Sequence, residues 1–280
     1  MSGTEADPLM ARVLDPAHRF TGEGACWDPM TDSLVWVDIW AGQVLRTGLE
    51  GETELVWATM PPVGFACPTA DGLLVGAGLD LWLLPPSGIA AHVCRVAGAP
   101  DGSRINDGAI DAHGRVWFGT VTPQGMDSIL FRCADGRLEP VLQGLSVANG
   151  IDWSPSGDRI YLADTGTGII HAAAYDPGSG ATGPFETWAQ RDPGAPDGLC
   201  VTPDGAVWVA EIFTGRVVEL VDGRPRRELL VPCPRVTSVA YGAGRLFVTT
   251  GTKDLTDEQL REHPDAGSLY VMEELASVTR

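Results

Sequence analysis

The chain has 280 residues, of which 44% are hydrophobic, so wholesale disorder is excluded. Its net charge of −18 argues against a nucleic-acid or anionic-membrane partner, because both require a basic face. Glycine (35) and proline (21) make up one residue in five, which indicates many turns without reaching the level of a low-complexity chain.

The first residues and the cysteines bear on the compartment. The N-terminal stretch is acidic and lacks the basic and apolar regions of a signal peptide, and no apolar run in the chain is long enough for a transmembrane helix. The six cysteines are scattered without a Cys-x-x-Cys pair, so reduced thiols are expected. We therefore expect a cytoplasmic protein without membrane contact, as a monomer or a weak homo-oligomer.

A pair of short strands recurs six times along the chain. Each unit has an apolar strand, a polar turn rich in Gly or Asp, and a second strand centred on a large apolar residue. The units cover residues 26–39, 67–78, 109–120, 151–165, 200–211 and 239–251. Their large residues, 38 to 47 residues apart, are Trp36, Leu74, Trp117, Tyr161, Trp208 and Phe247. This spacing is typical of four-stranded propeller blades.

Further strands follow the repeated pairs, for example at residues 129–132 and 216–220, and the one helical candidate covers 256–263 with Thr256 as its N-cap. The sequence therefore predicts an all-β, six-bladed β-propeller with four-stranded antiparallel blades around a central channel. We expect a single domain over residues 1–280, in which the strand-like Arg12-Val13-Leu14 closes the last blade.

Four polar residues stand at nearly the same position in different repeats. Glu23, Asn106, Asn149 and Asp197 each lie 11 to 13 residues before the large residue of their unit. Equivalent positions in propeller blades converge on the channel axis, so these side chains are expected to meet at one mouth. Carboxylate and amide oxygens suit a hard divalent cation. The alternative is that Asn and Asp merely cap turns, but Glu23 is a poor turn residue.

The stretches around these four residues carry a resemblance to a known family. GEGACW at 22–27, RINDG at 104–108, NGIDW at 149–153 and PDGLC at 196–200 resemble motifs of the regucalcin (senescence marker protein), gluconolactonase and luciferin-regenerating enzyme family. The four motifs occur in order at blade spacing, and the resemblance covers nearly the whole chain.

The resemblance implies a six-bladed propeller that opens sugar lactones with one divalent cation in its channel. The matching positions make Glu23, Asn149 and Asp197 the metal ligands and place Arg104 and Asn106 at the substrate. Ca²⁺ is favoured, with Zn²⁺, Mn²⁺ or Fe²⁺ as alternatives. In this hypothesis Asp197 is the catalytic residue, accepting the proton of an attacking water activated by the metal.

Arg104 would bind ring hydroxyls or a carboxylate, and Asn106 would donate to the developing oxyanion. Gln124 is assigned to the substrate as well, but many relatives have an acidic residue at that position. A neutral amide there leaves the identity of the small-molecule lactone open.

Two other functions remain open at this point. One is a related metal-dependent enzyme that acts on another electrophile, such as an organophosphate or a secondary-metabolite ester. The other is a non-catalytic propeller that binds a protein or peptide, because the scaffold alone does not decide function.

Overall fold

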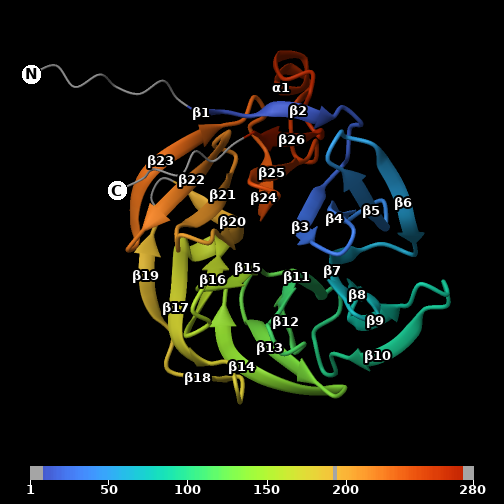
Figure 1. The fold of residues 1–280 in the computed structure, drawn as a ribbon, viewed down its shortest axis with the longest axis vertical. Coiled ribbons are helices and arrows are strands. Elements are labelled where there is room, and N and C mark those ends of the chain that lie inside the picture. Colours follow the sequence, from blue (N-terminus) through green and yellow to red (C-terminus); the bar gives the residue numbers. More distant parts are fainter. Residues whose placement is uncertain (1–8, 192–193, 274–280) are drawn as a thin grey trace, which may run out of the picture.

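The computed structural model describes residues 9–191 and 194–273, which form six sheets in a ring around a central channel (Figure 1). From the channel outward, the first three blades contain the following strands: β3 (Gly22–Asp28), β4 (Ser33–Asp38), β5 (Gln43–Gly48) and β6 (Thr53–Ala58); β7 (Val63–Thr69), β8 (Gly72–Ala77), β9 (Asp80–Leu84) and β10 (Ala91–Arg95); β11 (Arg104–Ile110), β12 (Val116–Val121), β13 (Ser128–Ala134) and β14 (Arg137–Leu145).

The other three blades complete the ring. They contain β15 (Ala148–Trp153), β16 (Arg159–Asp164), β17 (Ile169–Asp176), β18 (Ala181–Thr182) and β19 (Glu186–Gln190); β20 (Ala195–Val201), β21 (Val207–Ile212), β22 (Arg216–Val221), β23 (Arg224–Leu230) and β1 (Leu9–Met10); β24 (Val236–Gly242), β25 (Arg245–Thr250), β26 (Leu269–Met272) and β2 (Arg12–Asp15). In the fourth blade β18 and β19 both pair with β17, and in the fifth β1 adds to β23 as a parallel strand. The predicted all-β, six-bladed propeller is confirmed.

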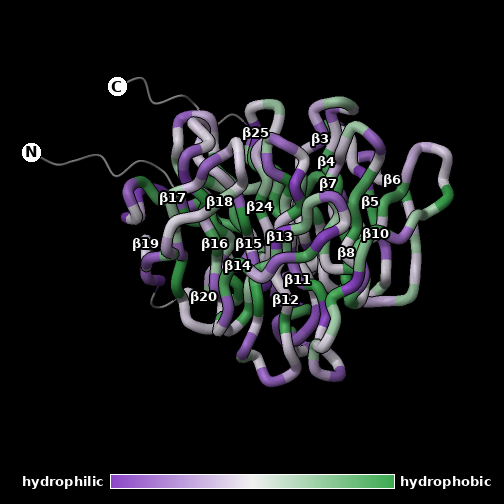
Figure 2. Tube along the Cα trace, turned by 90° about the horizontal axis from the view of Figure 1, so that it is seen from below, coloured by the Kyte–Doolittle hydropathy of each residue, from purple (hydrophilic) through white to green (hydrophobic). Residues whose placement is uncertain are grey.

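The hydrophobic core lies between neighbouring blades. Trp36 packs with Phe247 across the first and sixth blades, and Trp117 packs with Ile151 across the third and fourth. Figure 2 shows hydrophobic residues concentrated in the strands and hydrophilic residues in the loops at the two ends. The large apolar residues that mark the repeats therefore hold adjacent blades together by removing apolar surface from water.

The strand near the N-terminus completes the sixth blade. β2 pairs antiparallel with β26, so the first and last parts of the described chain lie in one sheet, as the blue and red ribbons show (Figure 1). The helix predicted at 256–263 is present as α1 (Asp257–Glu262), and Thr256 and Gln259 form a capping box. A short 3₁₀ helix, η1 (Thr165–Thr167), follows β16.

Leu14 ties this closing strand to the core, and its truncation tests the closure. It is 9% exposed and belongs to the cluster that contains Leu34, Trp36 and Phe247. We expect Leu14→Ala to lower the free energy of unfolding by about 2–4 kcal/mol, because it leaves a cavity between two blades. Met10→Ala, at a residue 57% exposed on β1, should stay within about 0.5 kcal/mol. Urea unfolding followed by tryptophan fluorescence measures both, and equal effects of the two variants would contradict the role of Leu14.

The ring has two faces that differ in which ends of the strands they carry. We call the face at which the innermost strands begin the top face. The second strands end at this face, because Gly22 pairs with Asp38 and Arg104 with Val121. The top face therefore also carries the turns that follow the second strands. The bottom face carries the turns between the innermost and second strands. No helix in the part of the chain that the structure describes is long and apolar enough to cross a membrane, and the six cysteines are free thiols.

Candidate active site

All six innermost strands change register at one level of the channel. The pairing with the second strand shifts by one residue within each of these segments: 23–26, 63–65, 105–108, 148–151, 196–199 and 236–238. Bulges of this kind bend a strand and re-aim its side chains. The bulges therefore form a ring at which side chains that are far apart in the sequence face the channel.

The four polar residues predicted to converge lie at this level. Asn106, Asn149 and Asp197 stand inside their bulges, and Glu23 stands at the edge of its own. Each of the four side chains is at most 8% exposed. Four polar groups are thus buried on four different blades at the same depth.

The strand register corrects one alignment made from the sequence. Trp36 lies opposite the bulge of its blade, whereas Trp117 and Trp208 lie two residues before theirs. In the first blade the position equivalent to Trp117 is Leu34, which is 11 residues after Glu23. The spacing from Glu23 to Trp36 is longer than in the other blades because Trp36 stands two residues later in its strand than Trp117 does. The position of Glu23 at the bulge is unaffected.

Asn149 and Asp197 are joined directly. The Nδ2 group of Asn149 donates to Oδ1 of Asp197 and, at 3.1 Å, to the hydroxyl of Thr165. The Oδ1 atom of Asn149 is buried and has no hydrogen-bond partner among the described residues. A buried carbonyl oxygen without a donor is costly unless something else satisfies it.

The donor set fits a divalent cation. Glu23 and Asp197 supply carboxylates, and the unpartnered oxygen of Asn149 supplies a neutral ligand of the kind Ca²⁺ accepts. Among the described residues, no group of three or more His, Cys, Asp or Glu side chains is arranged to hold a metal. The predicted set therefore depends on the amide of Asn149 as its third member.

The electrostatics of the two carboxylates are strongly perturbed. Burial first, and then the nearby Asp107 carboxylate, raise the pKa of Glu23 to about 8. Burial and then the charge of Glu23 raise the pKa of Asp197 well above its ordinary value. Acids crowded together in a low-dielectric site hold protons unless a positive charge replaces them.

Two arginines oppose these acids. Arg104 and Arg235 both act electrostatically on Glu23 and Asp197, lowering the pKa of each. Burial in turn lowers the pKa of the Arg104 guanidinium to about 10. Arg235 is 7% exposed, and its Nη1 group is 3.2 Å from the carboxylate of Asp254.

Arg235 and Asp107 carry charge at the site without having been assigned a role from the sequence. Arg235 directly precedes the bulge of the sixth blade, so its position in the repeat was the available signal. Asp107 follows Asn106 inside one bulge and its pKa is raised to about 6, mainly by burial. In a regular strand neighbouring residues face opposite sides, so the sequence pattern does not indicate that both belong to the channel.

The remaining predicted residues differ in their surroundings. Asn106 uses one N–H of its Nδ2 group to bind the carbonyl oxygen of Ala148 at 3.0 Å, which links the third and fourth blades. Gln124 lies in an exposed turn just after β12, three residues beyond Val121, which pairs with Arg104. Gln124 therefore reaches the top face but is not among the buried groups.

Two further acids at the top face organise the blades. Asp38 accepts hydrogen bonds from the backbone N–H groups of Phe20 and Thr21, and Asp164 accepts them from Ser146 and Val147. Each acid thus holds the start of an innermost strand to the second strand of the same blade. Their structural role leaves Glu23, Asp107 and Asp197 as the acids at the level of the bulges.

The channel continues below the ring of bulges as a cavity of about 470 Å³. Residues from all six innermost strands line it, including Asp107, Asp152, Cys67 and Cys200. Burial raises the pKa of Asp152 to about 6, although its carboxylate accepts hydrogen bonds from the backbone of Val201 and Trp153. The candidate site thus opens at one end onto a cavity along the axis.

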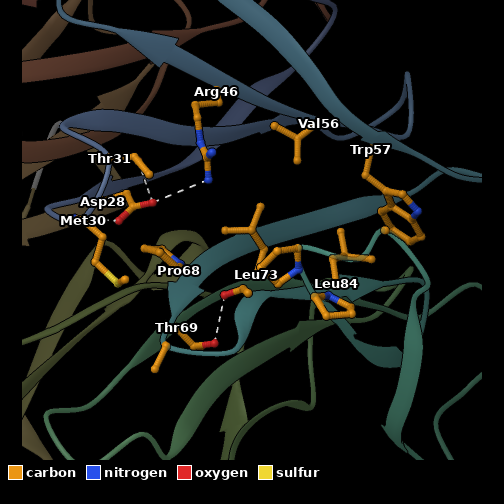
Figure 3. Close-up of a pocket in the computed structure, with 15 residues that line it drawn as sticks. Asp28, Met30, Thr31, Arg46, Val56, Trp57, Pro68, Thr69, Leu73 and Leu84 are labelled. Atoms are coloured by element: carbon orange, nitrogen blue, oxygen red, sulfur yellow. Dashed lines mark hydrogen bonds and ion pairs between the residues drawn. The ribbon is translucent and has the colours of Figure 1, made fainter.

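A separate groove of about 340 Å³ lies on the side of the ring between the first and second blades (Figure 3). Val56, Leu73 and Leu84 form its apolar wall, and an ion pair of 3.5 Å joins Arg46 to Asp28 (Figure 3). The carboxylate of Asp28 is paired with Arg46, so this groove does not contain crowded acids like those in the channel. The channel is therefore the candidate active site.

Comparisons with known proteins find chains that are similar over most of their length. An L-arabinolactonase of Azospirillum brasilense is 32% identical over 277 positions, covering 93% of this chain and 91% of that protein. A pentonolactonase of Haloferax volcanii is 32% identical over 260 positions, covering 88% and 86% of the two chains. The crystal structure of a calcium-binding protein, regucalcin, from Agrobacterium tumefaciens shares the fold with a TM-score of 0.88 at 23% identity, covering 95% of both chains.

The family model described as the SMP-30/Gluconolactonase/LRE-like region matches residues 21–252. This range begins just before β3 and ends just after β25, so it contains every innermost strand and all the buried polar groups of the channel. The chain belongs to the SMP-30/gluconolactonase/LRE-like family.

Proposed function

We propose that the protein is a metal-dependent lactonase that opens the ring of a small lactone at the top of its channel. The observation that carries this proposal is the buried oxygen set of Glu23, Asn149 and Asp197, in which the Asn149 carbonyl oxygen is unpartnered among the described residues. Relatives named as lactonases at 32% identity support the reaction class. The solved relative described as calcium-binding supports a divalent cation, and Ca²⁺ is the favoured one.

Glu23, Asn149 and Asp197 would hold the cation, which when bound would polarise the lactone carbonyl and lower the pKa of a water. Asp197 would accept the proton of the attacking water. A carboxylate held at the site by its hydrogen bond from Asn149 is placed to take that proton. Arg104 would orient the lactone from the side of the third blade, and Arg235 would balance the acids from the sixth.

Asn106 would stabilise the oxyanion that forms when water adds to the carbonyl. One N–H of its amide is bound to Ala148, which fixes the plane of the group. The other N–H is then a preorganised donor, and the loss of one such donor typically costs about 3 kcal/mol in the barrier. Gln124, in its exposed turn, would contact only a part of the substrate that extends to the top face.

A lactone panel tests the function. We expect protein treated with EDTA to lose at least about 99% of its turnover, and the addition of Ca²⁺, Mn²⁺, Zn²⁺ or Fe²⁺ to restore it, because without the cation nothing polarises the lactone carbonyl and lowers the pKa of the water. The measurement is acid release at constant pH with γ- and δ-lactones, and a phosphotriester tests another electrophile. Turnover that is unchanged by EDTA would contradict metal dependence, and the absence of turnover on every lactone would contradict the reaction class.

A further inference from the structure

Several large apolar side chains are exposed in loops of the top face, where the innermost strands begin. Five of them are 41–83% exposed and lie in the loops that precede innermost strands or follow second strands: Phe20, Trp40, Met60, Met126 and Phe213. Exposed apolar groups that cluster around a site, rather than standing singly, mark a surface that binds apolar ligands.

Two of these side chains reach the charged groups of the site itself. The ring of Trp40, from the first blade, lies 5.7 Å from the guanidinium carbon of Arg104 on the third blade. The centre of the Phe213 ring, from the fifth blade, lies 5.2 Å from the guanidinium carbon of Arg235. Each arginine that acts on Glu23 and Asp197 is therefore covered by an aromatic ring from another blade, in contacts of the cation–π kind.

The position of Phe213 is maintained against the preference of its backbone. Its φ is 64°, in the left-handed region that a bulky residue rarely adopts. The next residue, Thr214, donates hydrogen bonds from its backbone and its hydroxyl to the carbonyl oxygen of Glu211, which holds the turn. A strained aromatic residue half exposed above a buried arginine points to a role in contact with a ligand.

Two of the polar groups assigned to the substrate are limited as partners for sugar hydroxyls. Arg104 has Trp40 over its guanidinium, and its Nη1 group donates to the carbonyl oxygen of Ile105 at 3.1 Å. Gln124 is exposed and neutral, where a carboxylate would accept hydroxyl protons. A substrate group beside Arg104 or Arg235 therefore has an aromatic ring within reach.

We propose that the preferred substrates are lactones with an apolar substituent, and that Trp40 and Phe213 hold this substituent at the top face. The proposal rests on the proposed lactonase function. The lactone ring would enter the level of the bulges, where the acids and arginines lie, and its alkyl or aryl group would remain against these aromatic rings at the top face. Each methylene that is partly removed from water there adds about a two- to fourfold preference.

Three γ-lactones test this assignment with the metal-loaded protein. We expect kcat/KM for γ-octalactone, which carries a butyl chain, to exceed that for γ-butyrolactone and for L-arabino-1,4-lactone by at least about tenfold. A higher value for the sugar lactone would overturn the apolar preference and leave the lactonase function standing. The absence of turnover on all three would overturn both, so the two failures are distinguishable.

Substitutions in the two rings test the residues themselves. Trp40→Ala and Phe213→Ala should each lower the ratio of kcat/KM between γ-octalactone and γ-butyrolactone by about three- to tenfold, mainly through KM. Trp40→Leu and Phe213→Leu, which keep apolar surface, should retain most of the ratio. The matched control is Ile89→Ala, at a residue 79% exposed in the turn after β9 at the bottom face. A ratio unchanged in both alanine variants, or lowered equally in Ile89→Ala, would overturn the assignment.

Discussion

Asp197→Asn is expected to reduce lactone turnover by at least about 10³-fold while the protein remains folded. The substitution removes a metal ligand and the general base together, and a positioned base alone contributes about 10² to 10⁴. The fold should persist because the asparagine oxygen can still accept the hydrogen bond from Asn149. Turnover is measured after chelation and re-addition of the cation, and thermal unfolding checks the fold.

Asp71→Asn is the matched control for this experiment. It makes the same change of charge in an exposed turn of the bottom face, on the second blade. Its turnover should stay within about twofold of the unmodified protein, since surface changes away from a site rarely exceed about 0.5 kcal/mol. Full turnover of Asp197→Asn with the restored cation would show that the assigned mechanism is wrong.

The affinity for a divalent cation is expected to rise at least about tenfold per pH unit between pH 5 and 8. The raised pKa of Glu23, about 8, means that this acid holds a proton below that pH in the metal-free protein. A cation must displace this proton, so binding is weaker in acid by about 10³-fold over the interval. Calorimetric titration with Ca²⁺ in two buffers of different ionisation enthalpy measures both the affinity and the protons released.

Glu23→Gln is the control for the same prediction, because it removes the titrating group. Its affinity for the cation should be weaker at pH 8 and should depend less steeply on pH, because Asp197 is then the remaining ligand whose pKa burial raises. The stability of the metal-free protein gives a second readout. Between pH 4.5 and 8 the unfolded chain has lost the Glu23 proton that the folded chain retains, so stability falls as pH rises through this window. The melting temperature should fall less in Glu23→Gln, and pH-independent binding to the unmodified protein would contradict the prediction.

Most of the candidate site follows from the position of polar residues within the repeats. Glu23, Asn106, Asn149 and Asp197 are spread along most of the chain, yet their repeat offset predicts one level, and the structure buries all four there. The offset works because blades are equivalent units around one axis. The offset predicts the common level even though Trp36 is not the residue equivalent to Trp117, because this misalignment changes the count by only two residues.

Other features depend on contacts between blades, which no local pattern contains. The bulges turn both Asn106 and Asp107 toward the channel, although neighbours in a strand ordinarily face opposite sides. Arg235 acquires its importance from the acids of other blades, and Trp40 from the distant Arg104. Each of these relations joins residues at least 38 positions apart, or depends on an irregularity that the alternation of apolar residues does not reveal.

The sequence by itself determined the architecture and the chemical type of the site: six strand repeats of blade length, and an oxygen-rich set of acids and amides at one offset. It did so because strand alternation and turn chemistry are local, and because a closed ring converts a repeat position into a place near the axis. Only the tertiary structure decided how the charges are balanced and what surrounds them. Burial, the opposition of Arg104 and Arg235 to Glu23 and Asp197, and the aromatic rings at the top face arise when blades meet, and electrostatic energies depend on those distances and on the exclusion of water.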